Sequence, residues 1–206
     1  IYASSGSVYG VKEEEKVTKD LSLVPISVYN KTKRVSERIF LSYKDEVTIH
    51  CIRPATVCGF SPRMRLDLSV NMLTMQALKN KKITVFGGNQ TRPNIHITDM
   101  VRVYEHFLSK SDIPSGIYNA GFENISILEI AELISEKIPS EIIITESNDP
   151  RSYRLSSDKL LATGFEQSCS IESAIEEIIE KYSSGEIQDS PESYTVGWMK
   201  NLNLHL

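Results

Sequence analysis

The chain has 206 residues, of which 40% are hydrophobic and 24% charged, and its formal net charge is −4. This length suits one large domain or two small ones. It carries no long basic run to support nucleic-acid binding, and no apolar stretch approaches the roughly 18 residues of a membrane span. The three cysteines are odd in number and lack metal-ligand spacing, so we expect a cytoplasmic protein with buried thiols and no metal: Cys51, Cys58 and Cys169.

The first residues, "IYASSGSVYG", are typical of the end of a buried strand followed by small polar residues. Because the sequence begins inside this strand, without an initiator methionine, we expect the natural N-terminus to lie further upstream. A polar stretch follows over residues 11–25 and predicts a surface loop. From Ser27 a helix begins, and its apolar residues form much of a stripe: Val28, Val35, Ile39 and Phe40.

This first helix places a tyrosine and a lysine four residues apart, Tyr29 and Lys33. Residues at this spacing lie on the same face of a helix. One interpretation is a surface helix with a lysine whose stem lies along it. The other is an acid/base pair, since an ammonium group favours the charged form of a neighbouring phenol.

Strands and helices alternate along the rest of the chain. A strand over 47–60 should end at Arg53-Pro54, because proline cannot continue a central ladder. Further strands are expected at 83–88, 95–98, 117–120 and 141–145, and helices within 61–82 and at 100–110, 126–138 and 170–184. Asp99 is a candidate cap for the second of these helices, and Ser126 with Glu129 forms a capping-box pattern. The alternation predicts an α/β fold with a parallel sheet.

The predicted order brings three features to one edge of that sheet. Ligands of open α/β sheets bind beyond the carboxyl ends of the strands. The "SSGSVYG" and "RPATVCG" strand ends would both face this crevice, and the helix between them would deliver Tyr29 and Lys33. A free tyrosine titrates near pH 10, and lowering that pKa by about three units requires roughly 4 kcal/mol. Lysine can supply part of this, while a serine hydroxyl holds the substrate oxygen.

Five blocks of sequence, spread from residue 1 to about 179, resemble the extended short-chain dehydrogenase/reductase family. They are "YASSGSVYG", "YNKTK", "RPATVCGFSPR", "VFGGNQTRPNIHITDM" and "DPRSYRLSSDK". A single Tyr-x-x-x-Lys pair is common, whereas five blocks in family order are specific. The resemblance implies the C-terminal part of a Rossmann-type doubly wound sheet plus a smaller α/β substrate domain. It implies cofactor-domain residues at 1–60 and mainly substrate-domain residues at 61–206, with 92–110 returning to the Rossmann sheet.

The resemblance also implies roles for individual residues. Members of the resembling family are NAD-dependent or NADP-dependent epimerases and dehydratases of nucleotide-diphosphate sugars, and many are homodimers. The implied catalytic residues are Ser5, Tyr29 and Lys33. Pro54 and Val57, together with Tyr29 and Lys33, would line the cofactor site. The substrate would contact Ser5, Thr56, Arg92 and Arg151, the two arginines on the phosphate side because the guanidinium fork suits phosphate oxygens.

The chain departs from the family in lacking the glycine fingerprint of the first βα turn. None of its ten glycines forms G-x-G-x-x-G or a related spacing. Family members carry this motif ahead of the "YASS" strand, where it lets the backbone approach the cofactor pyrophosphate. We therefore expect about 100 further residues upstream, at about 30 per βαβ unit.

The residues before the strand-end tyrosine bear on the reaction. In the family's 4,6-dehydratases an acidic residue stands two or three positions before this tyrosine, where the chain has Gly6 and Ser7. Neither side chain can exchange a proton at neutral pH. This favours C4 epimerisation through a transient 4-keto sugar over 4,6-dehydration or keto-sugar reduction. A non-catalytic descendant that binds a nucleotide sugar or a protein is a further alternative.

Overall fold

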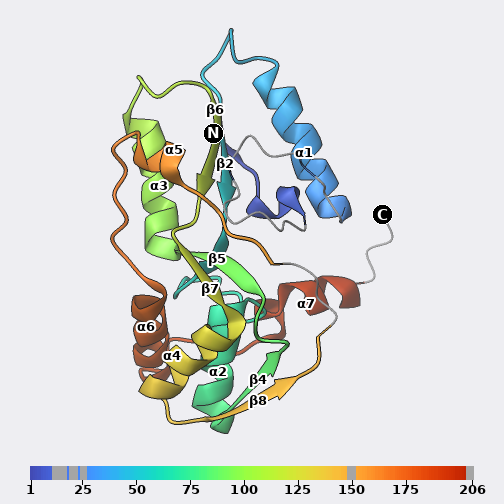
Figure 1. Ribbon diagram of the computed structural model, residues 1–206, viewed down its shortest axis with the longest axis vertical. Helices are drawn as coiled ribbons and strands as arrows, with labels where there is room; N and C mark the ends of the chain where they lie inside the picture. The colour runs from blue at the N-terminus through green and yellow to red at the C-terminus, as the bar shows by residue number, and fades with distance from the viewer. Residues whose placement is uncertain (11–17, 19–22, 24–26, 148–151, 203–206) are drawn as a thin grey trace. The chain divides into compact units, whose positions relative to one another are not determined.

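The computed structural model describes all of the chain except residues 11–17, 19–22, 24–26, 148–151 and 203–206. Arg151 and most of the predicted polar loop therefore lie outside the described residues. The chain divides into two compact units that interleave along the sequence (Figure 1). The first unit comprises Ile1–Val57, Gln90–Ile125 and Asp149–Ser168, and the second comprises Cys58–Asn89, Ser126–Asn148 and Cys169–Leu206.

A parallel sheet forms the centre of the first unit. Its order is β1 (Tyr2–Ala3), β2 (His50–Pro54) and β6 (Gly116–Ala120), with Cys51 opposite both Tyr2 and Ile117. The first four residues of β2 are buried, as expected for a central strand between two neighbours. The predicted α/β fold with parallel strands is thus confirmed.

A second sheet has the order β3 (Thr56–Cys58), β5 (Thr91–His96) and β7 (Glu123–Ser126). The sequence did not predict β7, because its four residues, Glu-Asn-Ile-Ser, carry too little alternation or β-branching to indicate a strand. The predicted strand 95–98 also differs, since β5 ends at His96.

The start of helix α3 (Ile97–Ser109) corrects the prediction that Asp99 is its cap. The cap is His96, whose Nδ1 accepts the backbone N–H of Thr98 at 3.1 Å. Asp99 lies within the first turn and is fully buried. Its carboxylate accepts the backbone N–H of Ser168 and pairs with Arg102. Its role is thus to join α3 to a distant loop, a contact that sequence spacing cannot indicate.

Helix α1 (Val28–Leu41) follows its cap Ser27, whose Oγ accepts the backbone N–H of Asn30 at 3.1 Å. The start of this helix is as predicted. Its only buried residues are polar, Asn30 and Glu37. The apolar stripe is instead exposed: Val28 by 76%, Val35 by 55%, Ile39 by 57% and Phe40 by 41%.

The core of the first unit lies between the sheet strands, the turn η1 (Gly6–Tyr9), α3 and α5 (Asp158–Leu161). It is built from aliphatic and aromatic side chains, among them Val8, Ile52, Val103, Phe107, Tyr118 and Leu160. This core fixes the sheet and the turn that together carry the strand-end sequence "SSGSVYG".

The second unit contains a parallel pair, β4 (Lys82–Phe86) and β8 (Glu141–Thr145), and three longer helices. These are α2 (Ser69–Asn80), α4 (Ile127–Lys137) and α6 (Ile171–Ser183), which pack together through buried aliphatic residues. The predicted capping box at Ser126 and Glu129 is confirmed at the start of α4. The chain continues through η2 (Pro191–Ser193) into α7 (Thr195–Asn201), a helix whose weak periodicity gave no prediction.

Candidate active site

The strand-end sequence folds into a tight turn. Ser5 follows β1 with an extended backbone and caps η1, its Oγ accepting the backbone N–H of Ser7 at 3.2 Å. Gly6 is buried, and a Cβ there would lie 3.1 Å from the carbonyl oxygen of Pro54 at the end of β2. Glycine is therefore favoured here by the close approach of η1 to the end of β2.

A chain of side-chain hydrogen bonds joins this turn to helix α1. The Oγ atoms of Ser5 and Ser7 lie 2.7 Å apart, and Ser7 Oγ donates to Asn30 Oδ1 at 2.7 Å. Asn30 directly follows Tyr29 in the first turn of α1 and is 8% exposed. Ser7 and Asn30 thus link the predicted catalytic serine, Ser5, to the neighbour of the predicted catalytic tyrosine, Tyr29. Neither of them was predicted to have a structural role.

Tyr29 and Lys33 lie together as their spacing predicts. The Lys33 Nζ is 5.5 Å from the centroid of the Tyr29 ring and 5.2 Å from that of the Tyr2 ring. It also donates to the carbonyl oxygen of Ala3 at 2.8 Å, which ties α1 to β1. Tyr29 itself is 55% exposed, so its phenol is accessible. A cation is thus fixed near the ring of an accessible tyrosine.

Behind these residues lies a buried polar network that the sequence analysis missed. Arg53 on β2 donates to both carboxylate oxygens of Glu37 at 2.7 Å, and its guanidinium lies 4.7 Å from the Tyr9 ring centroid. Ser4 Oγ donates to Glu37 at 2.5 Å, and the Tyr9 hydroxyl donates to Asn119 on β6 at 2.8 Å. The network joins the residue after β1 to η1, α1, β2 and β6.

The ionisation of the network follows from its burial and its partners. Burial raises the pKa of Tyr9, although the nearby positive charge of Arg53 works against this. For Arg53, burial alone would lower the pKa, but the hydrogen bonds and charge of Glu37 raise it above its ordinary value. Arg53 therefore stays charged, and Tyr9 stays a neutral donor. The signal in the sequence was a polar series on α1 at helical spacing, Asn30, Lys33 and Glu37.

The other predicted site residues lie near the strand ends. Pro54 is the last residue of β2. Thr56 and Val57 lie in β3, where Val57 packs against the core of the first unit. Arg92 lies in β5, is half-buried, and its Nη1 approaches the Thr91 carbonyl oxygen at 3.4 Å. Ser5, Tyr29 and Lys33 are thus gathered around η1, whereas Thr56 and Arg92 belong to the second sheet.

The donors around η1 fit the nicotinamide-ribose end of a dinucleotide. The Lys33 ammonium and the Tyr29 hydroxyl are accessible hydrogen-bond donors on one helix face, and ribose hydroxyls can accept from both. Among the residues that the structure describes, no group of three His, Cys, Asp or Glu side chains could hold a metal ion. Within the same residues, every helix is too short or too polar to cross a bilayer.

Comparison with known proteins adds independent evidence. Residues 1–121 match the family model described as "NAD dependent epimerase/dehydratase family". The chain is 36% identical over 140 residues to the Bacillus subtilis protein named "Uncharacterized UDP-glucose epimerase YtcB", an alignment covering 66% of this chain and 43% of that protein. It is 26% identical to UDP-glucuronic acid decarboxylase 1 of Danio rerio, over 89% of this chain and 47% of that protein. The chain therefore spans about half the length of such relatives.

Solved structures agree with the fold. The UDP-glucuronic acid 4-epimerase of Bacillus cereus, solved with UDP-glucuronic acid and NAD, superposes with a TM-score of 0.75 at 26% identity, over 88% of this chain and 60% of that one. The ADP-L-glycero-D-manno-heptose-6-epimerase of Helicobacter pylori superposes with a TM-score of 0.78 at 21% identity, over 89% of this chain and 59% of that one. The second likeness concerns the fold alone.

Proposed function

Because the chain belongs to the NAD dependent epimerase/dehydratase family, we propose that the complete protein is a nucleotide-sugar epimerase that inverts C4 through a transient 4-keto sugar. NAD is the proposed cofactor, with NADP as the alternative. The first unit would carry the cofactor and the reacting groups, together with Thr56, Arg92 and Arg151, the residues proposed to contact the sugar nucleotide.

The observation that carries this proposal is the grouping of three side chains at η1. Tyr29 presents an accessible phenol, Lys33 fixes a positive charge 5.5 Å from its ring, and Ser5 stands at the adjacent strand end. An alcohol oxidation and its reversal need a proton-transfer group, stabilisation of its charged form and a hydrogen bond to the reacting oxygen. The three residues supply one each.

The proposal gives each of the chain's own residues a part in this chemistry. A bound nicotinamide would accept a hydride from the sugar carbon and return it. Tyr29 takes the proton of the C4 hydroxyl during oxidation and gives it back after the sugar has turned over. Lys33 stabilises the negative charge on the phenol oxygen and binds the ribose. Ser5 holds the reacting oxygen, while Pro54 and Val57 line the nicotinamide side and Thr56 contacts the sugar.

The nucleotide diphosphate would be held by arginines. Arg92 on β5 is the main proposed contact, since a guanidinium donates two parallel hydrogen bonds to phosphate oxygens. Arg151 is the second proposed contact. Replacing Arg92 by Lys should weaken nucleotide-sugar binding, because a point charge does not reproduce the planar fork.

The turn favours epimerisation over dehydration. Elimination of water across C5 and C6 needs a second acid/base beside the tyrosine. At position 6 a side chain would press on the Pro54 carbonyl oxygen, because even a Cβ would lie 3.1 Å from it. At position 7 a serine hydroxyl is already bonded to Asn30. Neither position offers an acid, which supports the simpler reaction.

The test uses the full-length protein with NAD and a panel of UDP-, dTDP-, GDP- and CDP-sugars. Inversion of one sugar centre without loss of mass, followed by NMR and mass spectrometry, would support the proposal. A product lighter by one water would identify a dehydratase. In a parallel incubation with reduced cofactor and a nucleotide 4-keto sugar, net consumption of the cofactor would identify a reductase. Binding of a nucleotide sugar by both wild type and Tyr29→Phe, without turnover by either, would identify a non-catalytic binding protein.

We further propose that the protein is a homodimer through helix α1. Its outer side exposes Val28, Val35 and Ile39 by more than half, an unusual amount of aliphatic surface for one helix. A second copy of the same face would bury these side chains on both partners. Analytical ultracentrifugation of the full-length protein at micromolar concentration should give a dimer, whereas a monomer alone would contradict it.

A further inference from the structure

The hydrogen-bond chain from η1 to α1 has a defined direction. An amide oxygen has lone pairs and no proton, so it only accepts hydrogen bonds. The single hydroxyl proton of Ser7 is therefore used in the hydrogen bond to Asn30 Oδ1. The 2.7 Å contact between Ser5 and Ser7 then needs the proton of Ser5. In this arrangement the chain runs from Ser5 through Ser7 to Asn30.

This direction decides what Ser5 can offer a ligand. Its proton is engaged by Ser7, and one of its lone pairs accepts the Ser7 backbone N–H at 3.2 Å. The remaining lone pair can accept a hydrogen bond but cannot donate one. A sugar hydroxyl satisfies such a group for as long as it holds its proton, before that proton passes to Tyr29. A ketone oxygen, which can only accept, does not.

We propose that Asn30 acts through Ser7 as a positioning residue that reverses this chain between the alcohol and ketone states of the sugar. Turning the Asn30 amide by half a rotation about its last side-chain bond brings Nδ2 to Ser7 in place of Oδ1. Asn30 then donates to Ser7, Ser7 donates to Ser5, and Ser5 donates outward. Each hydroxyl only rotates about its C–O bond, so no covalent bond breaks and no proton leaves its oxygen.

The surroundings of Asn30 suit this role. It is 8% exposed, so little of it is open to water, and its backbone is anchored by the Ser27 cap. The two ends of an amide are nearly equal in size, so rotation asks little of the packing. A buried donor or acceptor left unmatched costs about 1–3 kcal/mol, which is the cost avoided by the reversal. The inference rests on the proposed function, because only a reaction that passes through a ketone needs both directions.

The discriminating variant is Asn30→Asp in the full-length protein. Aspartate has the same shape, but its carboxylate only accepts, so the chain is fixed in the direction that leaves Ser5 without a proton to donate. Aspartate in the first turn of a helix is compatible with folding, because it is favoured by the helix dipole. Binding is measured by calorimetry with UDP-glucose and with UDP-4-keto-6-deoxyglucose, each with and without reduced cofactor. We expect about a tenfold loss of affinity for the keto sugar and less than about a twofold change for UDP-glucose.

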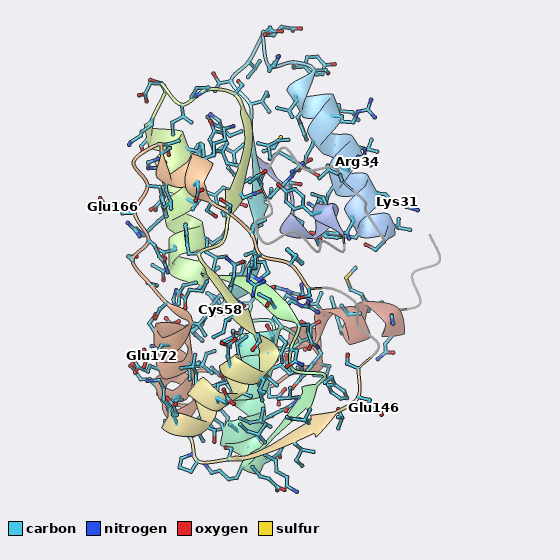
Figure 2. All side chains as sticks on the ribbon, viewed as in Figure 1. Lys31, Arg34, Cys58, Glu146, Glu166 and Glu172 are labelled. Carbon is cyan, nitrogen blue, oxygen red and sulfur yellow. The ribbon has the colours of Figure 1, made fainter. Side chains whose placement is uncertain are left out.

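Two further variants distinguish an effect of the direction of the hydrogen bonds from an effect of merely linking η1 to α1. Ser7→Ala frees the Ser5 proton, so its loss of keto-sugar affinity should be smaller than that of Asn30→Asp, although it removes the whole link. Lys31→Gln makes the same change in net charge one residue further along, on the exposed outer side of α1 (Figure 2), and should leave both affinities unchanged. If Ser7→Ala is the more damaging variant, Asn30 is a tether and the inference is wrong.

The pH dependence gives a second readout. In Asn30→Asp the carboxyl gains a donor when it takes up a proton, so affinity for the keto sugar should recover as the pH falls through its pKa. The ratio of the two affinities in wild type should not change over that range. Equal loss of both sugars at all pH values would overturn the inference and leave the proposed function standing. Failure of wild type to bind or convert any nucleotide sugar would overturn both.

Discussion

Helices α1 and α6 are nearly equal in length, and each starts from a serine cap, yet they bury opposite kinds of side chain. Helix α6 buries Ile171, Ala174, Ile175 and Ile178, as the hydrophobic period predicts. Helix α1 buries Asn30 and Glu37 and exposes its aliphatic residues. The period of the hydrophobic residues thus locates a helix, but the surroundings decide which of its faces is buried.

The reason lies in what each helix packs against. The inner side of α1 meets the turn after β1 and the end of β2, where Ser7 and Arg53 need polar partners. Burying those groups without partners would cost more than burying aliphatic side chains would gain. Helix α6 meets the apolar sides of α2 and α4, where its buried aliphatic side chains contribute through shape and volume. The two helices should therefore respond differently to substitution. Changes on α1 should act on polar contacts and activity, and changes on the buried side of α6 should act on apolar packing and stability.

The largest effect is expected from Tyr29→Phe on α1. It removes one hydroxyl from a 55% exposed side chain, so the free energy of unfolding should hardly change. Turnover should fall by about 10²–10⁴-fold, the usual contribution of a positioned acid/base. Nucleotide-sugar affinity should stay within about a few fold, since little besides proton transfer is lost. Steady-state kinetics and calorimetry of the full-length protein measure the two quantities.

The matched variant for that experiment is Tyr43→Phe, another exposed tyrosine two residues beyond the end of α1. It should retain wild-type turnover. Lys33→Ala should weaken both cofactor binding and rate, because Lys33 is proposed to serve both. A Tyr29→Phe enzyme that kept a tenth or more of wild-type turnover would remove Tyr29 from the mechanism.

The next largest effect is on stability, from Glu37→Gln on the buried side of α1. Glu37 is 2% exposed and neutralises Arg53, which is 1% exposed. Removing one partner of a buried ion pair typically costs about 3–5 kcal/mol, because the other charge stays buried. Denaturant unfolding of both proteins gives the difference. The control is Glu141→Gln, whose pair with Lys82 lies on the surface and should contribute little. Equal losses in the two variants would mean that Glu37 is not a structural group.

The sequence predicted those parts of the fold that depend on local patterns. The order of the predicted strands and helices, the start of α1 at Ser27 and the capping box of α4 each follow from a few adjacent residues, and all are present. Asp99 shows the limit of such patterns. Its spacing suits a helix cap, but its carboxylate binds Ser168, 69 residues further along the chain. A contact of that separation is set by the fold and leaves no local signal.

The candidate site was predicted in the same partial way. The strand-end motif and the Tyr-x-x-x-Lys pair indicated Ser5, Tyr29 and Lys33, because residue type and spacing are enough to predict their chemistry. The groups that orient them were not indicated. Asn30 and Glu37 look like ordinary polar residues of a surface helix, and only the structure shows that they face inward. Positioning residues act through contacts, so they are visible only when the contacts are known.

The third prediction compares one isoleucine on each helix. Ile175 on α6 is fully buried, so Ile175→Ala should destabilise the protein by about 2–4 kcal/mol through lost burial and the cavity left behind. Ile39 on α1 is 57% exposed, so Ile39→Ala should change the stability of the monomer by less than about 0.5 kcal/mol.

The outcome for Ile39 also tests the proposed dimer. If α1 pairs with a second copy, Ile39→Ala should raise the dissociation constant measured by sedimentation, although the monomer is as stable as wild type. A large loss of monomer stability in Ile39→Ala would show that α1 buries its aliphatic face within the chain. That result would remove the contrast between the two helices.

The smallest difference in stability between the two helices is expected at their caps, where they should behave alike. Ser27 and Ser170 each accept a backbone N–H of the first turn at 3.1 Å, so Ser27→Ala and Ser170→Ala should each cost about 1 kcal/mol. Only the first should affect turnover, by about threefold, because the N–H that loses its acceptor belongs to Asn30, next to Tyr29. Thermal unfolding and kinetics of the two variants test this directly. A matching loss of turnover in Ser170→Ala would show that activity follows general stability instead of the geometry of the first turn of α1.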